Sequence, residues 1–167
     1  MSRRTTTELL SAAAVLLASM FAWAIIAQAK TSKAAQATSI QGGGTSLVRG
    51  GTGSPAFAPV ETRFAFSWRH GTGGFECLAL VPHADAGTPG SGTFDTNAMY
   101  VTGSVTSARV EGRSAVLEGT ATVTGLGAGT DTPFTATVTR GGPGATLVLQ
   151  VSGLTFSEIV LEGEIRF

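Results

Sequence analysis

The stretch RFAFSWR, residues 63–69, alternates large aromatic side chains with small or polar ones. Phe64, Phe66 and Trp68 fall on one face of such a segment, because side chains in a strand point alternately to opposite sides. This period of two predicts a β-strand with one buried face. We therefore expect Trp68 in a core with its two aromatic neighbours, rather than on the surface as a stacking platform for a sugar.

Strand patterns continue toward the C-terminus. After a glycine-rich turn at residues 70–74, the segment FECLALV is apolar on both faces, as is typical of a strand in the middle of a sheet. Phe134, Ala136 and Val138 alternate with threonines, which predicts a strand with a solvated face. Further strands are expected at residues 99–110, 114–124, 145–151 and 158–167.

The last of these strands has a facing pattern of its own. Ile159, Leu161, Ile165 and Phe167 are expected to point toward the core, and Glu158 with the other charged residues to point outward. The chain is also rich in threonine and glycine, which favour strands and tight turns. The predicted fold is all-β: an antiparallel β-sandwich or small β-barrel of seven to nine strands, preceded by an N-terminal apolar helix.

That N-terminal helix is expected over residues 9–27 (LLSAAAVLLASMFAWAIIA). Two arginines precede it, and Ala27 and Ala29 form an A-x-A site directly after it, so the pattern predicts an export signal. The run of 19 residues is also long enough for a retained membrane anchor, with the domain outside. A twin-arginine signal and a pilin-like helix beginning at Glu8 are weaker alternatives.

These observations divide the chain into three predicted parts. Residues 1–29 form a signal peptide or membrane anchor, residues 30–56 a flexible linker rich in Gly, Ser, Thr and Ala, and residues 57–167 the β domain. The glycines at 42–44 are the expected soft point of the linker, although a first edge strand around residues 45–49 is an alternative. We expect the protein to be secreted or to lie in the cell envelope.

Composition and missing motifs exclude several functions. The chain has 11 basic and 11 acidic residues, a balance that does not suggest nucleic acid as a partner. It carries neither a dinucleotide-binding nor a phosphate-binding glycine motif, and we expect no cofactor. The single cysteine, Cys77, has no partner for an internal disulfide and lies in an apolar run, so we expect it to be a small buried side chain.

A long connection at residues 82–97 is the candidate binding loop. His83, Asp85 and Asp95 are its chemically versatile side chains. His83 and Asp85 could hold a metal ion if His70 came near, but zinc sites need three or four ligands, so we assign no metal site and no catalytic residue. An unidentified protein or glycan is the expected partner of this loop, and the membrane is a partner only if the N-terminal segment is uncleaved.

Several segments, taken in chain order, resemble those of a known protein family. They are the Gly-Gly-Gly lead-in, the aromatic strand at 64–66, the Glu-Gly-Arg turn at 111–113, the repeated threonine strands and the closing LEGEI at 161–165. Over residues 42–167 the chain resembles the small post-COAP-type modules of exported bacterial proteins. The resemblance implies an exported β module and assigns neither an activity nor functional residues.

We therefore expect an exported, non-enzymatic β module with a structural or binding role in the cell envelope or on the cell surface. Two alternatives remain open. One is a small β-barrel that carries an apolar ligand or acts as a hydrolase or isomerase, which requires a cavity of roughly 300 Å³ or more with a polar group in it. The other is a pilin-like surface subunit that keeps its N-terminal helix.

Overall fold

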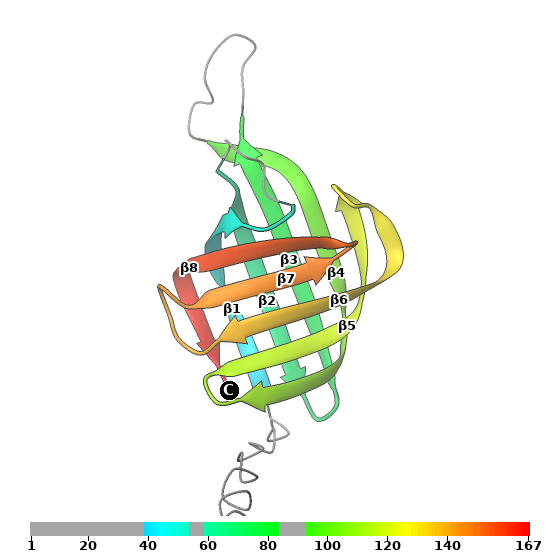
Figure 1. The fold of residues 1–167 in the computed structure, drawn as a ribbon, viewed down its shortest axis with the longest axis vertical. Coiled ribbons are helices and arrows are strands. Elements are labelled where there is room, and N and C mark those ends of the chain that lie inside the picture. The colour runs from blue at the N-terminus through cyan, green and yellow to red at the C-terminus, as the bar shows by residue number, and fades with distance from the viewer. Residues whose placement is uncertain (1–38, 54–58, 84–92) are drawn as a thin grey trace, which may run out of the picture. The chain divides into compact units, whose positions relative to one another are not determined.

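The strands close into an antiparallel barrel in a computed structural model of the protein, which describes residues 39–53, 59–83 and 93–167 (Figure 1). In chain order the strands are β1 (Ser39–Gly50), β2 (Glu61–Arg69), β3 (Thr72–Pro82), β4 (Phe94–Glu111), β5 (Ser114–Gly125), β6 (Gly129–Thr139), β7 (Thr146–Val151) and β8 (Leu154–Arg166). Each pairs with its neighbours in sequence, and β8 pairs with β1. The all-β prediction is confirmed, and of the two expected architectures the chain adopts the barrel.

Several predictions lie outside the described residues. They are the apolar helix at 9–27, the cleavage site at Ala27 and Ala29, and the loop residue Asp85. Across the three described ranges, no helix has the length and apolar character that crossing a membrane requires.

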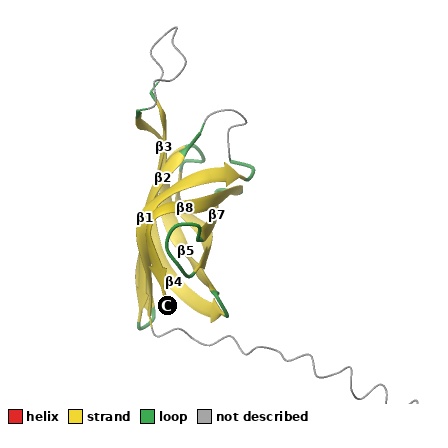
Figure 2. Cartoon of the chain, turned by 90° about the vertical axis from the view of Figure 1, so that its left-hand side faces the viewer, coloured by secondary structure: helices red, strands yellow, loops and turns green. Residues whose placement is uncertain are grey.

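The barrel has two walls and two corners. β1–β3 form one wall and β5–β7 the other, and the strands of the two walls cross steeply (Figures 1 and 2). β4 makes one corner: its pairing with β3 ends at Val105, and its pairing with β5 continues to Glu111. Thr106 is skipped in the β4–β5 pairing and forms a β-bulge at this bend. Bulges increase strand twist and let a sheet turn.

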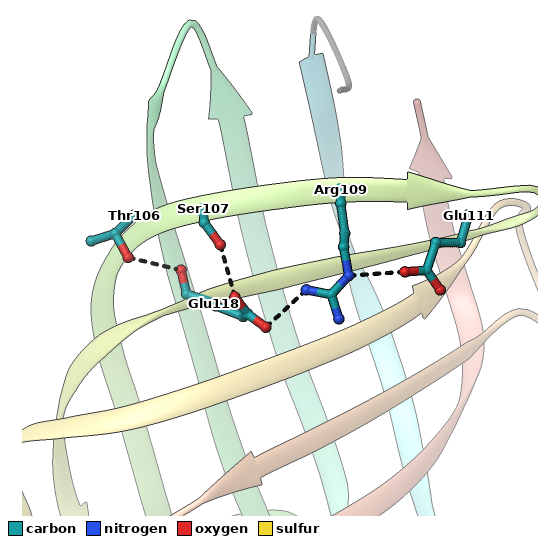
Figure 3. A network of polar contacts seen from close by, with 5 residues as sticks. All are labelled: Thr106, Ser107, Arg109, Glu111 and Glu118. Carbon is teal, nitrogen blue, oxygen red and sulfur yellow. Dashed lines mark hydrogen bonds and ion pairs between the residues drawn. The ribbon is translucent and has the colours of Figure 1, made fainter. Parts of the chain in front are cut away.

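A polar network covers the β4 corner (Figure 3). The carboxylate of Glu118 accepts hydrogen bonds from Ser107 Oγ and Arg109 Nη1, each at 2.9 Å, and Arg109 Nε donates to Glu111 at 2.9 Å. The hydrogen bonds from Arg109 and then Ser107 hold the pKa of Glu118 below its usual value. The Thr106 hydroxyl donates to the main-chain oxygen of Glu118 at 3.3 Å, so the network joins β4 to β5 at the bulge.

β8 makes the second corner, and there the predicted facing is wrong. Thr45 pairs with Glu162 and Ser46 with Val160, which leaves Leu161 as an extra residue. A shift of one residue sends every following side chain to the other face. Ile165 is buried as expected, but before the bulge Glu158 and Val160 point inward and Leu161 is 49% exposed.

The linker predicted for residues 30–56 is corrected at Ser39–Gly50, which form β1 and close the barrel, so the barrel begins before residue 57. The glycines at 42–44 belong to this strand, and at Gly42 and Gly44 neighbours occupy the space that a side chain would need. A Cβ at Gly42 would lie 2.4 Å from Cζ of Phe66, and one at Gly44 would lie 2.0 Å from the main-chain oxygen of Glu162. The glycines that made this segment look like a linker instead allow neighbouring strands to pack closely against β1.

Buried side chains fill most of the barrel interior. The aromatic strand contributes as predicted: Phe64, Phe66 and Trp68 are 4–5% exposed. The Phe66 ring stacks between Phe64 and Phe75, with ring centroids 6.0 and 6.4 Å apart. The Phe75 ring also contacts the tilted ring of Phe134, at a centroid distance of 5.0 Å. This row of buried rings fills the middle of the barrel.

Candidate functional site

An apolar cavity opens at one end of the barrel, where β1 and β3 end and β2, β4 and β8 begin. Its volume is about 350 Å³. Nearly all of its lining is apolar, with the Thr52 side chain and the backbone as the polar exceptions. The lining residues are Val48, Thr52, Gly53, Val60, Ala79, Val81, Ala98, Met99, Leu126, Leu154 and Phe156.

The rim of this cavity carries an exposed leucine. Leu126 lies in the turn between β5 and β6 and is 49% exposed, one of two large apolar side chains with such exposure in the described part of the chain. Its backbone N–H donates to the carbonyl oxygen of Ala98 at 3.0 Å, which fastens the turn to β4. An apolar molecule entering the cavity would therefore meet an apolar surface at the entrance.

A buried polar cluster lies inside the barrel. Glu158 of β8 is 4% exposed, and Ser46 of β1 and Thr62 of β2 are 0% and 1% exposed. The hydroxyls of Ser46 and Thr62 both donate to Oε2 of Glu158 at 2.5 Å and also contact each other. Oε1 of Glu158 has no hydrogen-bond partner among the described residues. A buried polar atom without a partner is costly, because water no longer compensates it.

The cluster alters the acidity of two side chains. Burial raises the pKa of Glu158, and the hydrogen bonds from Ser46 and Thr62 oppose that rise without cancelling it. Burial, and next the charge of Glu158, raises the pKa of the Cys77 thiol well above its ordinary value, while a hydrogen bond with Thr62 opposes this. Both groups are therefore biased toward their neutral, protonated forms.

Strand register places this cluster next to the cavity. Glu158 pairs across the β1–β8 ladder with Val48, and Thr62 pairs across the β2–β3 ladder with Ala79. Val48 and Ala79 line the cavity, as does Phe156, the inward residue before Glu158 on β8. The polar cluster thus lies one layer of side chains inward, between the cavity and the row of aromatic rings.

Of the residues predicted for a binding loop, His83 and Asp95 do not join this cluster, and Asp95 lies in β4 rather than in the loop. His83 and Asp95 come together, with Nδ1 and Oδ1 3.4 Å apart, and both side chains are about half exposed. His70 and His83 flank opposite ends of β3, about 35 Å apart at the usual rise per residue. No group of three or more metal-ligating side chains occurs within the described ranges.

The prediction for Cys77 is confirmed, since the free thiol is 4% exposed. Glu158, Ser46 and Thr62 were missed as site residues. A glutamate in an alternating segment is normally assigned to the solvated face, and only the bulge at Leu161 reverses that assignment. The one available signal was the pair of glycines at 44 and 163, which lie opposite each other beside the bulge.

Comparison with known proteins adds no relative to this description. No family model matches the sequence, and no similar protein was found among curated proteins or solved structures. The resemblance to post-COAP-type modules stays a prediction.

Proposed function

We propose that this chain is an exported, non-enzymatic barrel that binds one small apolar molecule in the open end between β1, β3, β4 and β8. The observation that carries the proposal is the cavity of about 350 Å³ with a nearly continuous apolar lining. Small-molecule sites are concave and mostly apolar, with volumes from about 300 Å³ upward.

The size of the barrel fits this proposal. An antiparallel barrel of eight strands has an interior that side chains can just fill, or that can hold one small ligand. Here the row of rings from Phe64 to Phe134 fills the middle, and the apolar cavity lies at one end. A cavity of about 150 Å³ accommodates benzene, so 350 Å³ suits a molecule of about two rings.

A neutral fluorescent dye tests the proposal. N-phenyl-1-naphthylamine brightens in apolar surroundings, and we expect it to bind the native, purified protein saturably with one dye per chain. Replacement of a half-buried cavity residue, Ala98→Phe, should reduce its affinity at least tenfold by occupying the space. The matched control is Ala65→Phe, which adds the same ring on the outside of β2 and should leave binding unchanged. Equal binding by all three proteins would contradict the proposal.

Export is a separate part of the proposal, supported by the apolar segment 9–27 and the small residues after it. Fractionation of cells that produce the full chain, followed by N-terminal sequencing, tests it. A protein that begins at Lys30 in the exported soluble fraction is the expected result. The full-length chain in a membrane fraction would favour the anchor, and the full-length chain in the cytosol would contradict export.

A further inference from the structure

The carboxyl group of Glu158 has one satisfied oxygen and one unsatisfied oxygen. Oε2 accepts two hydrogen bonds at 2.5 Å, from Ser46 and Thr62. Oε1 has no partner among the described residues, and Glu158 is 4% exposed. The two hydroxyls fix the orientation of the carboxyl group through Oε2, which leaves Oε1 as the only oxygen available to a further partner.

Residues that line the cavity neighbour the buried polar cluster on three strands. Val48 lies opposite Glu158 in the β1–β8 ladder, and Phe156 precedes it on the same face of β8. Ala79, the partner of Thr62 in the next ladder, has the smallest side chain of the three. All three line the cavity and Glu158 lies in the next layer of side chains inward, so a ligand seated among them would have its inner end next to that layer.

We propose that Glu158 anchors the polar end of the ligand, and that the ligand is an apolar alcohol or phenol whose hydroxyl meets Oε1 while its body fills the cavity. This inference rests on the proposed function and assigns the chemical class of the ligand. Cys77, the other titratable side chain beside Glu158, is a thiol and a weak hydrogen-bonding group, so the carboxyl group dominates recognition.

A hydroxyl suits this site better than a charged group. It both donates and accepts, so it can pair with Oε1 whether the carboxyl group is ionised or protonated. Burial favours the protonated form of Glu158, which offers a cationic amine no compensating charge. Among the described residues, the cavity lining contains no charged side chain, so an ionic ligand would lose its hydration without replacement there.

A matched pair of ligands separates the polar contribution from the apolar one. 2-Naphthol and 2-methylnaphthalene have nearly the same shape and differ in a hydroxyl against a methyl group. Displacement of the bound dye from the native protein gives both affinities. We expect Glu158→Leu, which keeps an apolar side chain of similar bulk, to shift the ratio of the two affinities about tenfold in favour of 2-methylnaphthalene.

The control is Glu162→Leu, the same substitution on an exposed residue of the same strand, and it should leave the ratio as in the native protein. An unchanged ratio in Glu158→Leu would overturn the inference while the cavity remains a binding site. Failure of both compounds and the dye to bind the native protein would overturn the proposed function itself.

A measurement on the native protein covers the case in which Glu158→Leu does not fold. Infrared difference spectra report the carboxyl stretch of a buried glutamic acid. Binding of 2-naphthol should shift that band, because Oε1 gains a partner, and binding of 2-methylnaphthalene should not. Identical spectra with both ligands would overturn the inference.

Discussion

The hydroxyl of Ser46 lies 2.5 Å from Oε2 of Glu158, although 112 residues separate the two in the chain. The contact joins the first strand to the last, across the ladder that closes the barrel. The buried cluster therefore depends on closure of the barrel, because the two residues would be far apart in an open sheet.

The raised pKa of Glu158 predicts how stability changes with pH. The folded protein holds this proton more tightly than the unfolded chain, so the stabilisation is complete below the ordinary glutamate value of 4.5. It is lost as the pH rises from that value through the raised pKa. Urea unfolding at several pH values should show this decline in the native protein and a flatter profile in Glu158→Gln. The same decline in both proteins would contradict the assignment to Glu158.

Gly42→Ala should destabilise the barrel by about 1–3 kcal/mol, because added atoms strain a packed core. The new methyl group would lie 2.4 Å from Cζ of Phe66, whose ring is held between Phe64 and Phe75. Gly43→Ala is the control, since its nearest contact would be 3.4 Å away. Thermal unfolding should show a clearly lower Tm for the first variant and a small change for the second; equal changes would contradict the packing argument.

Glu118→Gln should loosen the β4 corner. The substitution removes the carboxylate that accepts hydrogen bonds from Ser107 and Arg109, and it keeps a side chain of the same length. Because these groups are exposed, the loss of stability should be small and should fade at high salt. Amide hydrogen exchange should accelerate around Thr106 and Ser107. Glu164→Gln, which removes a contact with Arg166 on the same strand, should leave exchange at this corner unchanged.

Cys77 should be inert in the folded protein. Its thiol is buried and its pKa is raised, so the reactive thiolate is scarce and shielded. A disulfide reagent at pH 8 should label the protein only after urea is added. Ser104→Cys, at an exposed position on β4, should react at once in the folded state. Rapid labelling of native Cys77 would contradict its placement inside the barrel.

The sequence by itself determined most of the strands after residue 60 and much of the core. Alternation in residues 63–69 and 134–139 identified inward side chains correctly, because a strand with one buried face repeats every two residues. The turn at residues 111–113 also followed from local chemistry, with Gly112 at a φ of 64°. These features depend on neighbours in the chain, so local patterns suffice to predict them.

Only the tertiary structure decided that the sheet closes and that Glu158 faces inward. Closure needs Ser39–Gly50 to pair with β8, and the glycines that permit this approach have the composition of a linker. The bulge at Leu161 inverts the facing of the residues before it, and its position depends on the register with β1, a strand more than a hundred residues away. Period-two patterns carry no information about such distant pairings, so the sequence predicted an all-β chain, sandwich or barrel, and the tertiary structure alone created the buried polar site.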